Sequence, residues 1–179
     1  MENEVDYEEE YEDWKRKFDA IAKIHGTLEE PQEIEVLDLI MSKQNAEDII
    51  NGSKKVEYRN FTDFYIKRVM DMEIVNVLDC YKDNEQVKAI CAPDEVRDIL
   101  NPVRIVRQIH FHNYNNTWSL DVECIDNDLV WVDEEIAEWL YEEYGDSECL
   151  RYIEKEGENF KPFYIFYFVL GKIIKRVNI

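Results

Sequence analysis

The chain has 179 residues, of which 45% are hydrophobic and 35% are charged, and its formal net charge is −20. This length favours one domain with one core, and the apolar content, with only five glycines and four prolines, excludes disordered, collagen-like and low-complexity proteins. No run approaches the ~18 consecutive apolar residues that span a bilayer, so we expect no membrane partner.

The N-terminal part predicts a helix followed by a strand. Apolar residues recur every three to four positions over 11–25, and Gly26 stands where a helix commonly ends, which predicts an amphipathic helix. Residues 35–41 have the apolar density of a buried strand.

A short helix and a charged strand come next. Ser42 is a good N-cap for a helix over 43–51, and Gly52 follows its end. Residues 55–59 alternate apolar and charged side chains, which predicts a strand with one apolar and one charged face.

The middle of the chain predicts helices and then a hairpin. Patterns over 62–100 are mostly helical, with a helical turn over 94–100. Residues 103–113 and 117–125 have strand character and flank the turn residues Tyr114-Asn115-Asn116, so we expect a hairpin.

The C-terminal third predicts one helix and one or two strands. Asp133 is a suitable N-cap for a helix over 134–144, which Gly145 would end. The aromatic-rich run 162–170 is typical of a buried strand, and a last strand-like run, 173–177, follows Gly171-Lys172. We expect one curved sheet with two peripheral helices, 11–25 and 133–144. Its predicted strands are 35–41, 55–59, 103–113, 117–125 and 163–170.

The charge is divided unevenly. The net charge is −9 over residues 1–36, −2 over 37–120, −13 over 121–158 and +4 over 159–179. Because phosphate binding depends on bases, uniform acidity would oppose a nucleic-acid partner, whereas segregated acidity leaves one open. The blocks 1–36 and 121–158 also allow an alternative function, in which an acidic module binds a basic protein or imitates a nucleic acid.

The N-terminal residues indicate the cellular compartment, and the cysteines indicate whether a structural metal is expected. Residues 1–13 hold eight acids and no base, unlike a secretory or transit peptide, so we expect a cytoplasmic protein. The cysteines show neither a C-x-x-C pair nor zinc-type spacing, so we expect small buried thiols and no structural zinc. They are Cys80, Cys91, Cys124 and Cys149.

One motif carries a family resemblance. Residues 52–59, Gly-Ser-Lys-Lys-Val-Glu-Tyr-Arg, match G-x-K-x-x-E-x-R after a short helix. This resembles the signature of the ASCH family in the PUA-like superfold, and the stretches 110–124 and 166–174 agree in order. The resemblance implies an α+β domain over 35–179, a PUA-like curved mixed β-barrel with peripheral helices, after an acidic N-terminal helical extension over 1–34. It also implies a cleft beside the motif that takes RNA or a modified nucleoside.

The residues of the motif support a binding site on their own. Gly52 permits a sharp turn, and Glu57 and Arg59 share one strand face because residues two apart lie on the same side. A cation, a carboxylate and a guanidinium would converge there and bind phosphate or base edges. The alternative is a surface ion pair of Glu57 worth less than about 1 kcal/mol. The predicted ligand-binding residues are Lys54, Lys55, Glu57, Tyr58, Arg59 and Arg68, since aromatic and basic residues interleave through 58–68.

The resemblance also raises an enzymatic alternative. Some family members resemble amidohydrolases of 4-acetylcytidine, and Lys54 matches their expected catalytic lysine. Such a lysine needs a lowered pKa, whereas Glu57 stands where the amidase has a threonine and would keep Lys54 protonated. Glu123 is a candidate for the further catalytic carboxylate. We therefore expect binding rather than catalysis.

Other patterns point to no metal or cofactor. His110 and His112 share a strand face and have the chemistry of two metal ligands, but the sequence identifies no third ligand. No Walker loop, nucleophile elbow or dinucleotide fingerprint is present, so no cofactor is expected.

Overall fold

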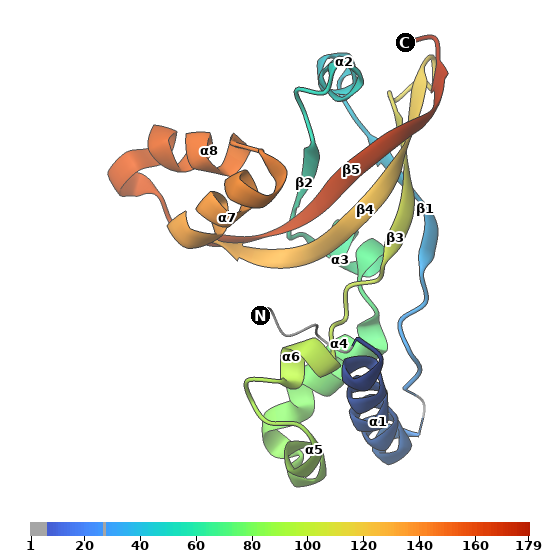
Figure 1. Cartoon of the computed structure of the whole chain (residues 1–179), viewed down its shortest axis with the longest axis vertical. Helices are drawn as coiled ribbons and strands as arrows, with labels where there is room; N and C mark the ends of the chain where they lie inside the picture. The colour runs from blue at the N-terminus through green and yellow to red at the C-terminus, as the bar shows by residue number, and fades with distance from the viewer. Residues whose placement is uncertain (1–6, 27) are drawn as a thin grey trace. The chain divides into compact units, whose positions relative to one another are not determined.

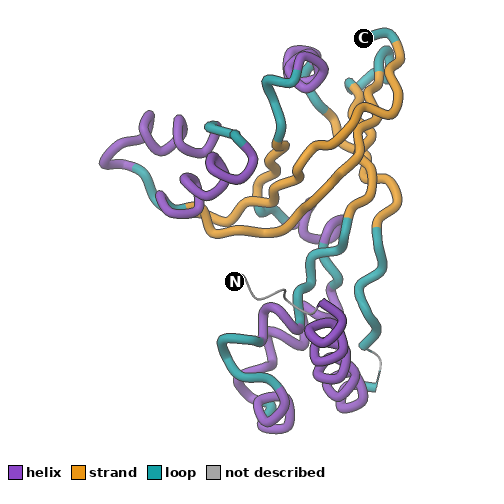
Figure 2. Tube along the Cα trace, in the orientation of Figure 1, coloured by secondary structure: helices purple, strands orange, loops and turns teal. Residues whose placement is uncertain are grey.

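The computed structural model describes residues 7–26 and 28–179, which form an α+β structure of eight α-helices and five strands (Figure 1). They divide into two compact units. Unit 1 comprises the described residues of Met1–Gln32 together with Met70–Pro102, and unit 2 comprises Glu33–Val69 together with Val103–Ile179. All five strands belong to unit 2, while unit 1 consists of helices and loops (Figure 2). The expectation of a single core is thereby corrected.

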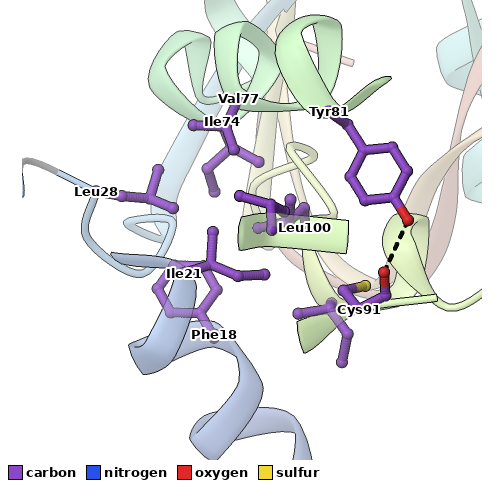
Figure 3. Close-up of a cluster of buried hydrophobic side chains, with 10 residues drawn as sticks. Phe18, Ile21, Leu28, Ile74, Val77, Tyr81, Cys91 and Leu100 are labelled. Atoms are coloured by element: carbon purple, nitrogen blue, oxygen red, sulfur yellow. Dashed lines mark hydrogen bonds between the residues drawn. The ribbon is translucent and has the colours of Figure 1, made fainter. Parts of the chain in front are cut away.

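Unit 1 is held together by the first helix and a segment from the middle of the chain. Its helices are α1 (Tyr7–His25), α4 (Met72–Cys80), the 3₁₀ turn η1 (Tyr81–Asp83), α5 (Glu85–Ile90) and α6 (Val96–Ile99). Phe18 and Ile21 of α1 pack with Ile74, Val77 and Leu100 in one buried cluster (Figure 3). Residues 70–102 therefore share a core with α1. The division expected from the sequence, into 1–34 and 35–179, places these two segments in different parts of the chain.

Unit 2 is built on one mixed sheet. Its strands are β1 (Ile34–Ile40), β2 (Val56–Asn60), β3 (Val106–His112), β4 (Ser119–Val132) and β5 (Phe163–Val177). Their order is β1-β3-β4-β5-β2, with β1 parallel to β3 and the other neighbours antiparallel. The sheet is strongly curved, as predicted (Figure 1). The five strands do not close into a barrel, because β1 and β2 are edge strands that no strand ladder joins.

The helices with clear capping signals lie where the sequence predicts them. In α2 (Lys43–Asn51) the Ser42 hydroxyl accepts a hydrogen bond from the Asn45 amide, and Gly52 ends the helix at φ 81°. In α7 (Glu134–Tyr144) the Asp133 carboxylate accepts from the Ile136 amide, and the end residue, Gly145, has φ 69°. Each side-chain cap satisfies an otherwise unpaired amide and contributes about 1 kcal/mol.

The C-terminal half of unit 2 differs from the prediction in three ways. Strand β4 continues seven residues beyond the predicted end, and helix α8 (Glu148–Glu156), followed by η2 (Gly157–Asn159), was not predicted. Strand β5 passes through Gly171 without a break. A Cβ atom at Gly171 would lie 2.8 Å from Oε2 of Glu123, so glycine here permits a close approach between neighbouring strands rather than a turn.

Helices α7 and α8 cover one face of the sheet beside β2 and β5. Ala137, Leu140 and Cys149 pack against Val56 and Ile165 in a buried cluster. Helix α3 (Asp63–Val69) follows β2. Cys91, Cys124 and Cys149 are buried, as predicted, but Cys80 is exposed, because α4 packs into the unit 1 core through Ile74 and Val77 and Cys80 lies outside that cluster. Within the described chain, no helix combines the length and apolar character that crossing a membrane requires.

Candidate functional site

The motif residues lie on both faces of strand β2. Glu57 and Arg59 pair with Phe168 and Phe166 of β5, and they share the face of these two buried rings. Tyr58 lies between them and therefore points to the opposite face, toward α8. The predicted shared face of Glu57 and Arg59 is confirmed, whereas Tyr58 belongs to a different environment.

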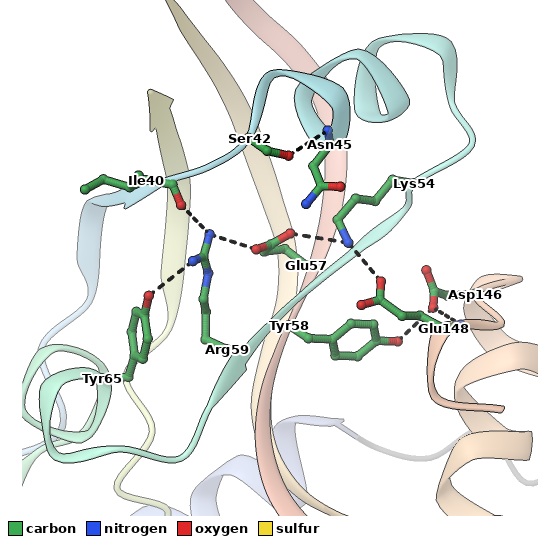
Figure 4. Close-up of polar contacts among 10 residues, drawn as sticks. All are labelled: Ile40, Ser42, Asn45, Lys54, Glu57, Tyr58, Arg59, Tyr65, Asp146 and Glu148. Carbon is green, nitrogen blue, oxygen red and sulfur yellow. Dashed lines mark hydrogen bonds and ion pairs between the residues drawn. The ribbon is translucent and has the colours of Figure 1, made fainter. Parts of the chain in front are cut away.

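Four charged side chains form a continuous row that we call the ion ladder (Figure 4). Lys54 Nζ lies 3.0 Å from Oε2 of Glu148 and 3.4 Å from Oε2 of Glu57. Arg59 Nη2 lies 2.8 Å from Oε1 of Glu57. The ladder thus runs Glu148, Lys54, Glu57, Arg59, and Glu57 is only 5% exposed. The Glu57 contacts are therefore buried, unlike the surface ion pair considered from the sequence, and removing one partner would leave an uncompensated buried charge.

Burial and neighbouring charges set the protonation of the ladder. Burial raises the pKa of the Glu57 carboxyl, and the cations of Arg59 and Lys54 partly offset this. For Lys54, burial alone would lower the pKa of the ammonium, but the carboxylates of Glu57 and Glu148 raise it above its usual value. Lys54 is therefore an ammonium at neutral pH, which suits binding and opposes nucleophilic attack.

Arg59 also links the two edges of the open sheet. Its guanidinium donates to the Ile40 carbonyl of β1 at 2.9 Å and to the Tyr65 hydroxyl at 3.1 Å (Figure 4). Arg68 donates to the Asp38 carbonyl of the same strand at 2.6 Å. These arginine side chains satisfy edge carbonyls of β1 where a barrel would place a neighbouring strand. The Nε atom of Arg59 is buried and has no hydrogen-bond partner among the described residues.

The other predicted site residues lie apart from the ladder. Lys55 reaches Gly145 at the end of α7, and Arg68 stacks over Phe64 with its guanidinium carbon 5.0 Å from the ring centre. Glu123, on β4, accepts from the Lys172 amide at 3.4 Å and lies 3.9 Å from the Lys172 ammonium. The structure thus gathers Lys54, Glu57 and Arg59 and leaves Lys55, Arg68 and Glu123 elsewhere.

Two hollows share Glu148 and Tyr152, and Lys54 lines the second of them. The first, which we call the aromatic hollow, has a volume of about 480 Å³. It is lined by Tyr58, Asn60, Glu148, Cys149, Tyr152, Phe163 and Ile165. The second, the polar hollow, has a volume of about 510 Å³. It is lined by Asn45, Asp48, Ser53, Lys54, Asp146, Glu148, Arg151, Tyr152 and Lys155.

The acids around the hollows are engaged in internal contacts. Asp146 accepts from the Tyr58 hydroxyl at 3.0 Å and from the Glu148 amide at 2.9 Å. Asp48 accepts from the Gln44 side-chain amide at 3.0 Å. Burial and the nearby Cys149 and Asp146 raise the pKa of Tyr58, so its hydroxyl stays protonated. Similarly, burial raises the pKa of the Cys149 thiol to about 11, which makes it a poor nucleophile at neutral pH.

Helix α8 supplies the lining residues that the sequence analysis missed. Cys149 is buried, and Leu150 and Ile153 pack against the same core cluster, whereas Glu148, Arg151, Tyr152 and Lys155 line the hollows. The helical spacing of the apolar residues Cys149, Leu150 and Ile153 is a signal that could have predicted α8. It lies inside the block 121–158, which the sequence analysis interprets only by its charge beyond residue 144. Phe163, in contrast, came from a strand that was predicted.

The two histidines of β3 form carboxylate pairs away from these hollows. His110 Nδ1 lies 2.5 Å from Asp121 Oδ1, and His112 Nε2 lies 2.5 Å from Asp38 Oδ1. The two rings are stacked with centroids 5.5 Å apart. His112 Nδ1 also contacts the Asn113 carbonyl at 2.8 Å. These contacts give the histidines a role in attaching β1 to β3 and β4.

Comparisons of the chain with models of protein families, with curated proteins and with solved structures find no match in any of the three.

Proposed function

We propose that unit 2 recognises a nucleoside, either free or unpaired within RNA, in the two hollows that meet at Glu148 and Tyr152. The observation that carries this proposal is their adjacency, because an aromatic-lined hollow and a polar hollow meet at Glu148 and Tyr152. A nucleoside has the same two parts, since a planar base is attached to a hydroxylated sugar. The resemblance of residues 52–59 to the ASCH motif supports the same ligand class, because Lys54 lines the polar hollow.

The aromatic hollow suits a base in size and chemistry. Its volume of about 480 Å³ lies within the ~300–1,000 Å³ of typical small-molecule sites. Tyr58, Tyr152 and Phe163 offer ring surfaces for stacking. The Asn60 amide can pair with a base edge, and the Glu148 carboxylate can accept from an exocyclic amine.

The charge around the site favours a single nucleoside over a long polyanion. The polar hollow has three cations, Lys54, Arg151 and Lys155, and three acids, Asp48, Asp146 and Glu148. Two of these acids belong to the acidic block 121–158, which therefore reaches the motif. Because this balance leaves little net attraction for a phosphate backbone, RNA should bind weakly, and added salt should weaken the binding further by screening the few phosphate contacts.

A titration with the four ribonucleosides tests the proposal. We expect saturable NMR shift changes at residues of both hollows, and Tyr152→Ala should weaken binding roughly 5- to 150-fold because one stacking side chain contributes about 1–3 kcal/mol. Tyr114→Ala is the matched control, since Tyr114 is 85% exposed at the β3–β4 turn. Circular dichroism establishes that both variants are folded. Absence of any saturable shift, or equal losses in the two variants, would contradict the proposal.

We also propose a second candidate function, binding of a basic protein segment by unit 1. A hollow of about 640 Å³ in unit 1 is lined by Trp14 and Ile99, by one base, Lys17, and by five acids. These acids are Glu9, Glu10, Asp13, Glu95 and Asp98. The arrangement fits a segment with basic and apolar side chains. Titration of a Lys-Leu peptide against wild type and Trp14→Ala tests this function. Equal affinities of the peptide for the two proteins would contradict it.

A further inference from the structure

We infer that Arg151 and Lys155 of α8 form a phosphate site next to the proposed nucleoside site, so that the ligand is a nucleotide with a phosphate on its ribose. This inference rests on the proposed function and specifies its substrate class. The phosphate belongs either to a free mononucleotide or to the end of an RNA strand.

The distribution of bases along the chain singles out these two residues. The block 121–158 contains 15 acids and only two bases, Arg151 and Lys155. The two bases are four residues apart in α8. This spacing places them on one face of the helix, with their Cβ atoms about 6 Å apart. Both line the polar hollow. The only cations of an acidic segment thus meet at the same cavity.

The charges of these two residues are not neutralised within unit 2. On an isolated helix Glu148 would pair with Arg151 at the i,i+3 spacing, but its carboxylate instead contacts Lys54 at 3.0 Å. Arg151 uses only its Nε, which donates to the Ser147 carbonyl at 3.3 Å. Among the described residues, neither Arg151 nor Lys155 forms an ion pair.

The three acids of the polar hollow have other partners and form no ion pair with Arg151 or Lys155. Glu148 is in contact with Lys54, Asp146 accepts two hydrogen bonds, and Asp48 accepts one from Gln44. The groups still available to a ligand are the terminal guanidinium nitrogens of Arg151 and the ammonium of Lys155. A guanidinium and an ammonium together bind a phosphate by charge-assisted hydrogen bonds.

The position of the polar hollow fits a phosphate attached to a base in the aromatic hollow. Tyr152 lies between Arg151 and Lys155 in sequence, and its ring contacts Phe163 with centroids 5.6 Å apart. It lines both hollows, so a ligand that stacks on Tyr152 has its sugar beside the two cations. A single phosphate fits better than a polyphosphate because three carboxylates surround the same hollow.

The test compares each nucleoside with its 5′- and 3′-monophosphates in wild type and in the Arg151→Gln/Lys155→Gln double variant. Calorimetry of the full chain should show one monophosphate binding about 10- to 100-fold more tightly than its nucleoside, as expected for hydrogen bonds between charged groups. In the double variant the ratio of the two affinities should fall toward one. Lys172→Gln is the control, because Lys172 lies on β5 with a side chain that is 77% exposed and lines neither hollow, and it should keep the wild-type ratio.

The outcomes separate this inference from the proposed function. Equal affinities of nucleoside and monophosphate in wild type would overturn the inference and leave nucleoside recognition standing, whereas no binding of either ligand would overturn both. A wild-type ratio in the double variant would show that other residues hold the phosphate. A trinucleotide with a 5′-phosphate, compared with the same trinucleotide ending in a 5′-hydroxyl, distinguishes an RNA end from a free mononucleotide. A titration with inorganic phosphate alone measures how much of the monophosphate's affinity comes from the phosphate group.

Discussion

The two halves of the G-x-K-x-x-E-x-R motif occupy different physical environments. Glu57 and Arg59 lie on the sheet face that carries Phe166 and Phe168, where Glu57 is buried and Arg59 reaches across to β1. Lys54 lies at the rim, where it lines the polar hollow and contacts Glu148 of α8. Eight consecutive residues thus provide both a structural link and a wall of a candidate binding site.

This difference shows why a charged motif need not be wholly a binding motif. An edge strand of an open sheet has carbonyl groups without a strand partner, and side chains from a neighbouring segment can supply the missing hydrogen-bond donors. The guanidinium of Arg59 supplies donors to the Ile40 carbonyl, to Glu57 and to the Tyr65 hydroxyl. Lysine is less suited to this position, because its ammonium has fewer donors and lacks the planar fork. We therefore propose that Glu57 and Arg59 stabilise the sheet and that Lys54 is the motif residue that faces a ligand.

The largest expected effect is that of Arg59→Ala on stability. The substitution leaves the buried Glu57 carboxylate without its closest cation and removes the contact with β1, so we expect a loss of about 3–5 kcal/mol of unfolding free energy. Urea unfolding measures the loss. Hydrogen exchange should also accelerate at β1 amides more than at the central amides of β4 and β5.

The control for this prediction is Arg68→Ala. Arg68 donates to one exposed carbonyl of the same strand and contacts no carboxylate in the ladder, so its loss should cost only about 0.5–1.5 kcal/mol. Equal losses in the two variants would mean that the ladder contributes nothing beyond an edge hydrogen bond. The separation of the motif into structural and ligand-facing halves would then fail.

The second prediction concerns catalysis at the rim. Because neighbouring carboxylates raise the pKa of Lys54, the wild-type chain should not hydrolyse 4-acetylcytidine detectably at neutral pH. Glu57→Thr removes one of these carboxylates and is the change most favourable to activity, whereas Lys54→Arg cannot supply a neutral amine. Robust wild-type turnover that disappears in Lys54→Arg would refute the assignment of Lys54 to binding. Thermal unfolding of each variant excludes loss of the fold as the cause.

Local chemistry explains the elements that the sequence predicted well. Helices α2 and α7 have the predicted bounds because Ser42, Gly52, Asp133 and Gly145 act on amides and carbonyls within one turn of themselves. The shared face of Glu57 and Arg59 was likewise predictable, since it follows from the two-residue period of a strand.

Contacts between distant segments explain what the sequence did not reveal. The apolar stripe of α1 is visible in the sequence, but its partner segment, 70–102, lies beyond two strands that belong to unit 2. Glu148 contacts Lys54 across 94 residues, and no local pattern specifies such a pair. The open sheet was missed because a barrel and a side-chain bridge between β1 and β2 have the same strand pattern. They differ only in whether β1 and β2 pair with each other, which the sequence of either strand does not specify.

The smallest predicted effect concerns a third attachment of β1, through His112. Its Nδ1 faces the Asn113 carbonyl at 2.8 Å, and its Nε2 faces the Asp38 carboxylate at 2.5 Å. Both oxygens only accept, so the ring satisfies both contacts only when both nitrogens carry a proton. Burial alone would lower the pKa of His112, but the Asn113 carbonyl and the Asp38 carboxylate outweigh it and raise the pKa above 6.5. The His110 ring, stacked at 5.5 Å, is the neighbouring titratable group on the same strand.

The sign of the pH dependence follows from this raised pKa. A histidine whose pKa is higher in the folded chain stabilises the fold fully below its unfolded value of about 6.5 and loses this contribution as the pH rises through the folded value. Unfolding free energy should therefore decrease from pH 6 to pH 8 by a component that His112→Gln removes. NMR titration should place the His112 pKa above 6.5 in wild type and lower it in Asp38→Asn. If His112 titrates at or below 6.5, the imidazolium does not hold β1, and the attachment of this strand depends on Arg59 and Arg68 together with its ladder to β3.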